Sequence, residues 1–443
     1  MRTSFKGTGD IARSLMVSLM LLFLIACTAT TPVASAPTAT GLPESAPVLP
    51  TRTAAMEPTA AQARLPTAPP TEPSTDTPQP TILTLWHAFE KGSPDESALQ
   101  TAVTEVARVK SNVTISITRV SSDQIFSRFA REAAAGRGPD LFLASDDELG
   151  MLVRRNLLQP VDSWVKDTQS SISQIAIKGQ TLNGKQWGIP VAFKVTALYY
   201  NAGHLAEPPK TTSDLIKTIK TGSRIGINPN CFHNFGWYAA FGGGIFDDKF
   251  NTAIDKLEGT AAAFAYLKVL KETTGAANFF DDGNKADAAF ETAKIDLIIN
   301  GSWALHDYRK ALGASLKVGL IPSGPVGAAS PMVGVDAFYI NANTSNAAEA
   351  AWLALALTSK ENQKRFADTV GWVPVRVDVQ SADAAVQSFA SQAALGTNRP
   401  QVPELNGYWS SFCGTYDEVL KNGANPTTAV EKAYKTMKMI NGK

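Results

Sequence analysis

Three short segments decide the fold class of this chain: TILTLW at 81–86, VTISI at 113–117 and DLFLA at 140–144. The first two are rich in β-forming residues with apolar side chains at alternate positions, which is typical of strands. The third is apolar from its second residue on, which indicates a strand buried on both faces. Helical patterns separate the segments, from Asp95 to Lys110 and from Asp123 to Ala135. This alternation predicts an α/β fold with a parallel sheet.

Length and charge limit the classes of protein that this chain can belong to. It has 443 residues, enough for two or three domains, with 41 Lys and Arg against 40 Asp and Glu. That balance leaves no basic field for a polyanion, so we expect no nucleic-acid partner. Three cysteines exclude a disulfide-rich scaffold, and the Cys and His spacing fits no zinc site. We therefore expect neither a metal nor another cofactor.

The first 27 residues have the pattern of an export signal. A short basic region precedes an apolar run, 15–26, which as a helix would rise only about 18 Å. The hydrocarbon core of a bilayer is roughly 30 Å thick, so a cleaved signal is favoured over a membrane span. The run ends Leu24-Ile25-Ala26-Cys27, which resembles the lipobox of bacterial lipoproteins. We therefore predict a signal peptide at 1–27, lipidation at Cys27 and a lipid anchor on the outer face of the cytoplasmic membrane. A plain secretory signal with a chance cysteine is the alternative.

Residues 28–80 have the composition of a tether. They contain 12 of the 26 prolines of the chain and 12 threonines, with almost no large apolar residues. No core can therefore offset the entropy of ordering them. Fully extended, the segment would reach about 160 Å at roughly 3.1 Å per residue. We predict a disordered spacer between the lipid and a globular body at 81–443.

A series of short motifs runs through this body in one collinear order. Any one of them is weak evidence, since Asn-Gly-Lys is simply a good turn. In their shared order they resemble the bacterial maltodextrin-binding protein family, which are extracellular solute-binding proteins of ABC sugar importers. The motifs are GPDL at 138–141, LLQP at 157–160, NGKQWGIP at 183–190, LYYN at 198–201, PPKT at 208–211, AAF at 288–290, INGSW at 299–303, VGV at 333–335 and YW at 408–409.

The resemblance implies a periplasmic-binding-protein fold, in which two α/β lobes are joined by crossing hinge segments and hold a ligand in the cleft between them. Lobe one would comprise about 81–191 and 338–372, and lobe two about 195–333 and 374–443. Closure of the lobes would capture a carbohydrate, expected to be an oligosaccharide, for delivery to ABC permease subunits. We expect a monomer that performs no chemistry on its ligand.

Sugar binding requires aromatic platforms beside convergent polar groups. The resemblance implies that Trp303 and Trp409 stack against sugar rings. Trp237 lies beside a predicted cleft loop, although core packing is the alternative for this residue.

On the opposing lobe, the loop after the first predicted strand lies where open α/β sheets bind ligands. There, Glu90 and Lys91 correspond to an acid and lysine pair that contacts sugar hydroxyls, with a solvated loop pair as the alternative. Asp147 matches another contact position, with a helix cap as the alternative. His87 is a candidate donor or acceptor for a sugar hydroxyl.

Three positions depart from the family pattern. Ala144 replaces an aromatic platform, Glu148 replaces an arginine, and Lys194 replaces an acidic ligand residue in the first crossing. An anionic or modified sugar could pair with Lys194 through a charge-assisted hydrogen bond. A neutral sugar with a different set of contacts is the alternative.

Two cysteines remain beyond the lipobox. Under the resemblance, Cys231 and Cys413 both fall on lobe two beside the cleft, where an oxidising exterior allows a disulfide. Two separate buried thiols are the alternative.

The sequence gives other functions less support than sugar transport. A surface hydrolase lacks support, because the sequence has no Gly-x-Ser-x-Gly elbow, no His-Glu-x-x-His helix and four histidines in all. The same fold could bind a non-sugar solute, such as a polyamine, a metal chelate or a phosphate ester. It could also serve as a sensory or adhesion module.

Overall fold

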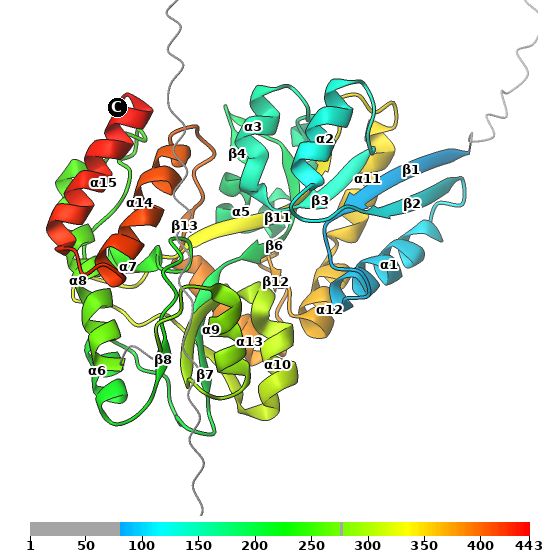
Figure 1. The fold of residues 1–443 in the computed structure, drawn as a ribbon. Helices are drawn as coiled ribbons and strands as arrows, with labels where there is room; N and C mark the ends of the chain where they lie inside the picture. Colours follow the sequence, from blue (N-terminus) through cyan, green and yellow to red (C-terminus); the bar gives the residue numbers. More distant parts are fainter. Residues whose placement is uncertain (1–79, 275–277) are drawn as a thin grey trace, which may run out of the picture. The chain divides into compact units, whose positions relative to one another are not determined.

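The computed structural model describes residues 80–274 and 278–443. The predicted lipidation site Cys27 and the predicted tether, apart from its last residue, lie outside the described residues. The described chain contains two main sheets, each with its own covering helices (Figure 1).

The first sheet has the strand order β12-β6-β11-β3-β1-β2, with β13 paired beside β11. Its strands are β1 (Thr81–His87), β2 (Val113–Arg119), β3 (Leu141–Ala144), β6 (Gly188–Lys194), β11 (Met332–Ile340), β12 (Val373–Pro374) and β13 (Thr397–Asn398).

The three strands predicted from the sequence are present, and β1 pairs in parallel with both β2 and β3. The prediction of a parallel sheet is wrong for β11, which is antiparallel to both β3 and β6. The reason is topological. The chain leaves the sheet at Lys194 and returns on β11 at the same end, where Gly334 pairs with Lys194.

Alternating side chains bury both faces of this sheet. Leu141 and Leu143 belong to one core, and Phe142 and Ala144 belong to another. The first core is covered by α1 (Pro94–Ala107), α11 (Ala347–Leu357) and α12 (Lys360–Val370). The second is covered by α2 (Ile125–Ala134) and α3 (Leu149–Arg154). The helices predicted at 95–110 and 123–135 correspond to α1 and α2, with ends that differ by one to three residues.

The second sheet has the order β10-β7-β9-β8. Its strands are β7 (Thr196–Asn201), β8 (Ile225–Gly226), β9 (Leu297–Gly301) and β10 (Leu316–Gly319). One of its cores includes α9 (Gly283–Glu291), α10 (Leu305–Leu312) and α13 (Ala384–Ala394). The other is formed with α6 (Thr212–Lys220), α7 (Gly236–Ala240), α8 (Leu257–Thr274), α14 (Leu405–Leu420) and α15 (Pro426–Asn441).

Shorter elements lie between α3 and β6. They are α4 (Asp162–Val165), α5 (Gln174–Gly179) and a two-stranded ribbon of β4 (Thr181–Leu182) and β5 (Lys185–Gln186).

Extended segments connect the two sheets. A single residue, Val195, separates the end of β6 from the start of β7. Strand β11 begins with Met332 in a core of the second sheet and continues into the first sheet. Strand β13 pairs with the first two residues of β11. We refer to Lys194–Thr196, β11 and 397–400 as the crossing segments.

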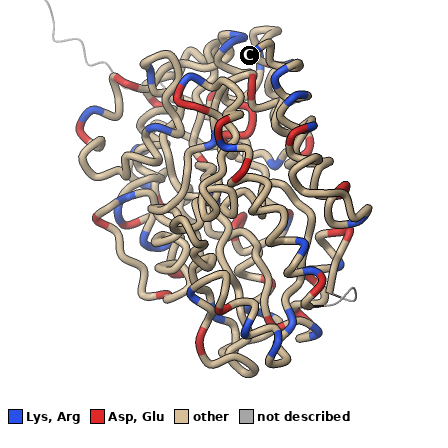
Figure 2. Tube along the Cα trace, turned by 90° about the vertical axis from the view of Figure 1, so that its left-hand side faces the viewer, with Lys and Arg blue, Asp and Glu red and all other residues tan. Residues whose placement is uncertain are grey.

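The surface mixes charges of both signs. Figure 2 shows Lys and Arg interspersed with Asp and Glu along the chain on the viewed side. Of the helices at 80–274 and 278–443, none combines the length and the apolar character needed to cross a membrane.

Candidate functional site

A cavity of about 340 Å³ lies where residues of both sheets and of the crossing segments meet. Phe89 and Phe126 line it from the first sheet, while Phe232 and Trp303 line it from the second. An adjoining hollow of about 410 Å³ shares Phe89 and Trp303 with the cavity. Both volumes fall in the range of small-molecule sites. The cavity is lined by Ala88, Phe89, Ser122, Ile125, Phe126, Leu143, Ala144, Ser145, Asp147, Lys194, Phe232, Trp303, Asp336 and Arg399.

An aromatic wall forms the second-sheet side of this cavity. Trp303 lies in a 3₁₀ turn directly after β9, and 44% of its surface is exposed. The ring of Phe232 lies 5.9 Å from the Trp303 ring at an angle of 44°. A Cβ on Gly301 would overlap the indole of Trp303, so glycine is required there for the indole to lie over the backbone. Two aromatic rings at one wall offer apolar faces against which a flat, apolar surface can stack.

Two cations line the cavity in ion pairs, and both come from crossing segments. Lys194 Nζ lies 3.5 Å from Asp336 Oδ2 on β11. Arg399 forms ion pairs with Asp147 and, at 3.3 Å, with Oδ1 of Asp146. The Arg399 guanidinium also lies over the Phe232 ring, 5.4 Å from its centre. The positive charges that line the cavity are therefore each compensated by a carboxylate.

Burial shifts the pKa of two of these carboxyls, Asp146 and Asp336. Burial raises the pKa of Asp146 to about 6, although the charge of Arg399 opposes the shift. Burial likewise raises the pKa of Asp336, and Lys194 opposes it. These directions follow from the cost of removing a charge from water, which the partner cation offsets only in part.

The structure brings three of the predicted site residues together. Trp303, Asp147 and Lys194 all line the cavity. Glu90 lines the adjoining hollow, where it accepts a hydrogen bond of 2.6 Å from Arg119 Nη2. These four positions remain candidates for ligand contact.

Two predicted site residues are buried in the structure and do not line the cavity. His87 is only 1% exposed, because it is the last residue of β1 and continues the buried face of Leu83 and Leu85. Its Nδ1 accepts a hydrogen bond from the Phe89 N–H, and burial lowers its pKa. Trp237 is also 1% exposed, since it packs inside the second-sheet core with its ring 5.3 Å from that of Tyr266.

Two further predicted residues lie apart from the cavity. Lys91 is exposed in the turn after β1, and Trp409 is half-buried on α14, with its ring 4.8 Å from that of Tyr408. Neither residue lines the cavity or the hollow that adjoins it.

Five residues that line the cavity were not predicted from the sequence: Phe89, Phe126, Phe232, Asp336 and Arg399. Phe89 follows His87 in the loop that was already predicted to face the ligand, so its position was a usable signal. Phe232 and Arg399 lie in irregular segments, where no periodicity indicates the direction of a side chain.

The structure joins Cys231 and Cys413 in a disulfide, with the Cα atoms 5.0 Å apart. The bridge connects the loop at 228–235 to α14 across 182 residues of sequence. Within the described part of the chain, no group of three or more His, Cys, Asp or Glu side chains could hold a metal ion.

Comparison with known proteins agrees with this architecture. Residues 101–395 match the family model of bacterial extracellular solute-binding proteins. The maltotriose-binding protein of Pyrococcus abyssi is 26% identical over 310 residues, which cover 65% of this chain and 67% of that protein. The galactooligosaccharide-binding protein of Bacillus subtilis is 26% identical over 330 residues, covering 69% and 78%.

Solved structures show the same fold. A cyclo/maltodextrin-binding protein complexed with maltotetraose matches with a TM-score of 0.70 and 23% identity, over 81% of this chain and 97% of that one. The Thermus thermophilus maltotriose binding protein matches with a TM-score of 0.68 and 24% identity, over 81% and 100%.

Proposed function

Because this chain belongs to the bacterial extracellular solute-binding proteins, we propose that it captures a neutral oligosaccharide and delivers it to the permease subunits of an ABC importer. In this proposal the ligand leaves chemically unchanged, and Cys27 carries a lipid that anchors the protein outside the cytoplasmic membrane. Residues 28–80 serve as the tether between this lipid and the binding body.

The observation that carries the proposal is that the aromatic wall of Trp303 and Phe232 lies beside charged side chains that are held in ion pairs. Trp303 and Phe232 offer ring faces to the apolar C–H face of a sugar. Asp147 and Asp336 supply hydroxyl acceptors, and Lys194 and Arg399 supply donors. Relatives named for maltotriose and galactooligosaccharide support a ligand of several sugar units.

Charge compensation favours a neutral ligand over an anionic one. Lys194 is paired with Asp336, and Arg399 is paired with two carboxylates, Asp146 and Asp147. An anionic sugar would have to displace a carboxylate from one of these cations, or else lie close to that carboxylate and be repelled by its charge. A hydroxyl can instead donate to a carboxylate or accept from a cation without breaking either pair.

Calorimetric titration of the purified full-length chain in detergent tests this proposal. The panel contains maltotriose, a galactooligosaccharide, a uronic-acid oligosaccharide and spermidine. We expect saturable binding of a neutral saccharide, which Trp303→Ala weakens about tenfold through loss of ring stacking. Binding of the uronic-acid oligosaccharide alone would overturn the neutral assignment. Binding of spermidine with no response to saccharides would overturn the carbohydrate assignment.

A further inference from the structure

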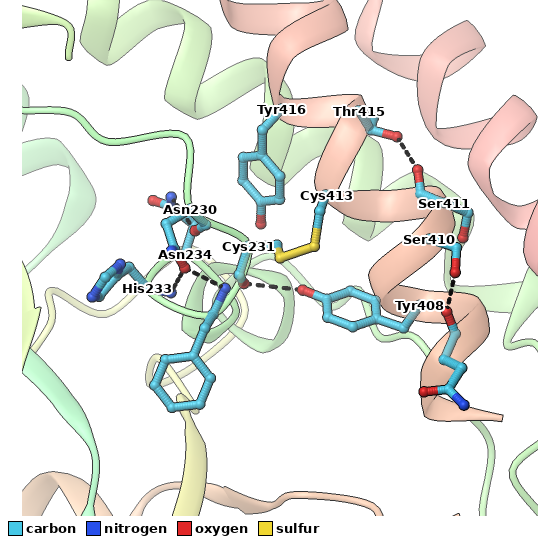
Figure 3. Close-up of a disulfide and its surroundings, with 12 residues drawn as sticks. Asn230, Cys231, His233, Asn234, Tyr408, Ser410, Ser411, Cys413, Thr415 and Tyr416 are labelled. Carbon is cyan, nitrogen blue, oxygen red and sulfur yellow. Dashed lines mark hydrogen bonds between the residues drawn. A yellow bond between two sulfur atoms is a disulfide. The ribbon is translucent and has the colours of Figure 1, made fainter. Parts of the chain in front are cut away.

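Phe232 reaches the cavity from a loop that is held at both neighbouring residues. Cys231 is bonded to Cys413 of α14, and its carbonyl oxygen accepts a hydrogen bond of 3.0 Å from the Tyr408 hydroxyl. His233 Nε2 lies 3.0 Å from Asn300 Oδ1 on β9. Figure 3 shows the disulfide on the α14 side of the loop and His233 on the side away from it. Phe232 therefore lies between two opposed anchors.

The hydrogen bonds around Asn300 fix the direction of the second anchor. Asn300 Nδ2 donates to Asp287 Oδ1 at 2.8 Å and to the Tyr308 hydroxyl at 2.7 Å. Its Oδ1 is consequently the acceptor, and His233 donates through Nε2–H. Burial lowers the pKa of His233 to about 4, so the ring is neutral at ordinary pH. This anchor ties the loop to the strand that ends two residues before Trp303.

Within the loop, the side chains of Asn230 and Asn234 form local hydrogen bonds to the backbone. Asn234 Nδ2 donates to the carbonyls of Asn228 and Asn230, and Asn230 Oδ1 accepts from the Phe232 N–H. These bonds are local and set the shape of the turn. The disulfide and Tyr408 instead set its position relative to α14.

We propose that the Cys231–Cys413 disulfide positions Phe232 as the second platform of the aromatic wall and thereby sets the affinity of the site. The inference rests on the proposed function, because it treats the cavity as the saccharide site. Cys231, Cys413 and Tyr408 are positioning residues, since none of them lines the cavity. Phe232 is the residue through which they act.

A double-mutant cycle with maltotriose tests this coupling. The four proteins are the wild type, Cys231→Ser/Cys413→Ser, Phe232→Ala and the combined variant. We expect the double-serine change to weaken binding about tenfold, the scale of one lost aromatic contact. In the Phe232→Ala background the same change should weaken binding less than about twofold, because the residue that transmits the effect is absent. Equal losses in both backgrounds would mean that the bridge acts on the fold in general.

A milder pair of variants covers the case in which the double-serine protein does not fold. Tyr408→Phe removes the hydrogen bond to the Cys231 carbonyl and keeps the disulfide. Tyr434→Phe is the matched control, because its hydroxyl bonds Thr260 and the Gly244 carbonyl in the same core and not the loop at 228–235. We expect Tyr408→Phe to weaken maltotriose binding about threefold, at about the strength of one hydrogen bond, and Tyr434→Phe to leave it unchanged. Equal binding by the two variants contradicts the proposal.

A ligand-free measurement separates this inference from the proposed function. Trp303 emission is obtained as the difference between each protein and the same protein with Trp303→Phe. Release of Phe232 should shift that emission when the disulfide is removed. A shift in a protein that binds no saccharide overturns the proposed function and supports the positioning role. Saccharide binding with neither an emission shift nor an affinity change overturns the positioning role alone.

Discussion

His233 should make the folded protein lose stability as the pH falls, and replacing it with glutamine should remove that loss. Its pKa is lowered to about 4 in the folded state by burial, whereas an unfolded histidine has a pKa of about 6.5. His233→Gln keeps an N–H that can donate to Asn300 Oδ1 and does not titrate. The variant therefore removes the titration of residue 233 and keeps its hydrogen bond to Asn300.

The sign and the size follow from proton binding. At pH 7.5 the ring is neutral in both states and contributes nothing to the pH dependence. At pH 5 the unfolded chain binds a proton that the folded chain does not, which favours unfolding by roughly 2 kcal/mol at 1.36 kcal/mol per pKa unit. The loss of unfolding free energy continues to about pH 3 and then levels off at about 3.4 kcal/mol.

Asp146 acts in the opposite direction over an overlapping range. Its folded pKa of about 6 lies above that of an unfolded carboxyl, so the folded state gains stability as the pH falls from about 6 to about 4. Both proteins contain Asp146, and the difference between them cancels its contribution.

The assay is guanidinium unfolding of the wild type and of His233→Gln at pH 7.5 and pH 5. Between pH 7.5 and pH 5, we expect the free energy of unfolding of the wild type to fall by about 2 kcal/mol more than that of the variant. A relative change below about 0.5 kcal/mol would refute the reasoning, since it would mean that His233 titrates as an exposed ring does.

Two further outcomes follow from contacts around the cavity. Gly301→Ala places a Cβ against the Trp303 indole and should weaken saccharide binding about tenfold by calorimetry, whereas Gly327→Ala, where a Cβ meets open space, should leave it unchanged. Arg399→Gln leaves buried Asp146 without its cation and should cost about 3 kcal/mol at pH 7.5 in guanidinium unfolding. Adding Asp146→Asn should restore most of that loss, and a double variant no more stable than Arg399→Gln contradicts the ion-pair argument.

The sequence was sufficient for the parts of the fold that local patterns determine. The structure confirms the strands predicted at 81–86, 113–117 and 140–144 and the helices between them. In each of these segments the spacing of apolar residues shows which side chains are buried and therefore which element forms. The direction of β11 was beyond such patterns, because it depends on where the chain re-enters the first sheet after building the second one. The family prediction is confirmed by the match over 101–395, which extends across both sheets.

The burial of two predicted site residues also has physical causes. His87 was assigned to the ligand because it lies at the carboxyl end of a strand. The two-residue period from Leu83 through Leu85 already placed it on a buried face. For Trp237, both core packing and ligand contact were open, and the helix α7 turns it into the core. Cys231 and Cys413 were recognised as a candidate bridge, but their relation to Phe232 depends on a loop whose shape no periodic pattern encodes.

The crossing segments explain why the charges of the cavity escaped detection as a set. Lys194, Asp336 and Arg399 are separated by more than 60 residues from one another, yet each lies where the chain passes between the sheets. These three side chains line the cavity, whereas Val195, Val333 and Val335 of the same crossing segments are buried in a core. Lys194 and Asp336 lie on neighbouring strands of the first sheet, whereas Trp303 follows β9 of the second sheet. A ligand that contacts side chains of both sheets would therefore bind best at one relative position of the sheets, and that coupling is what capture by closure requires.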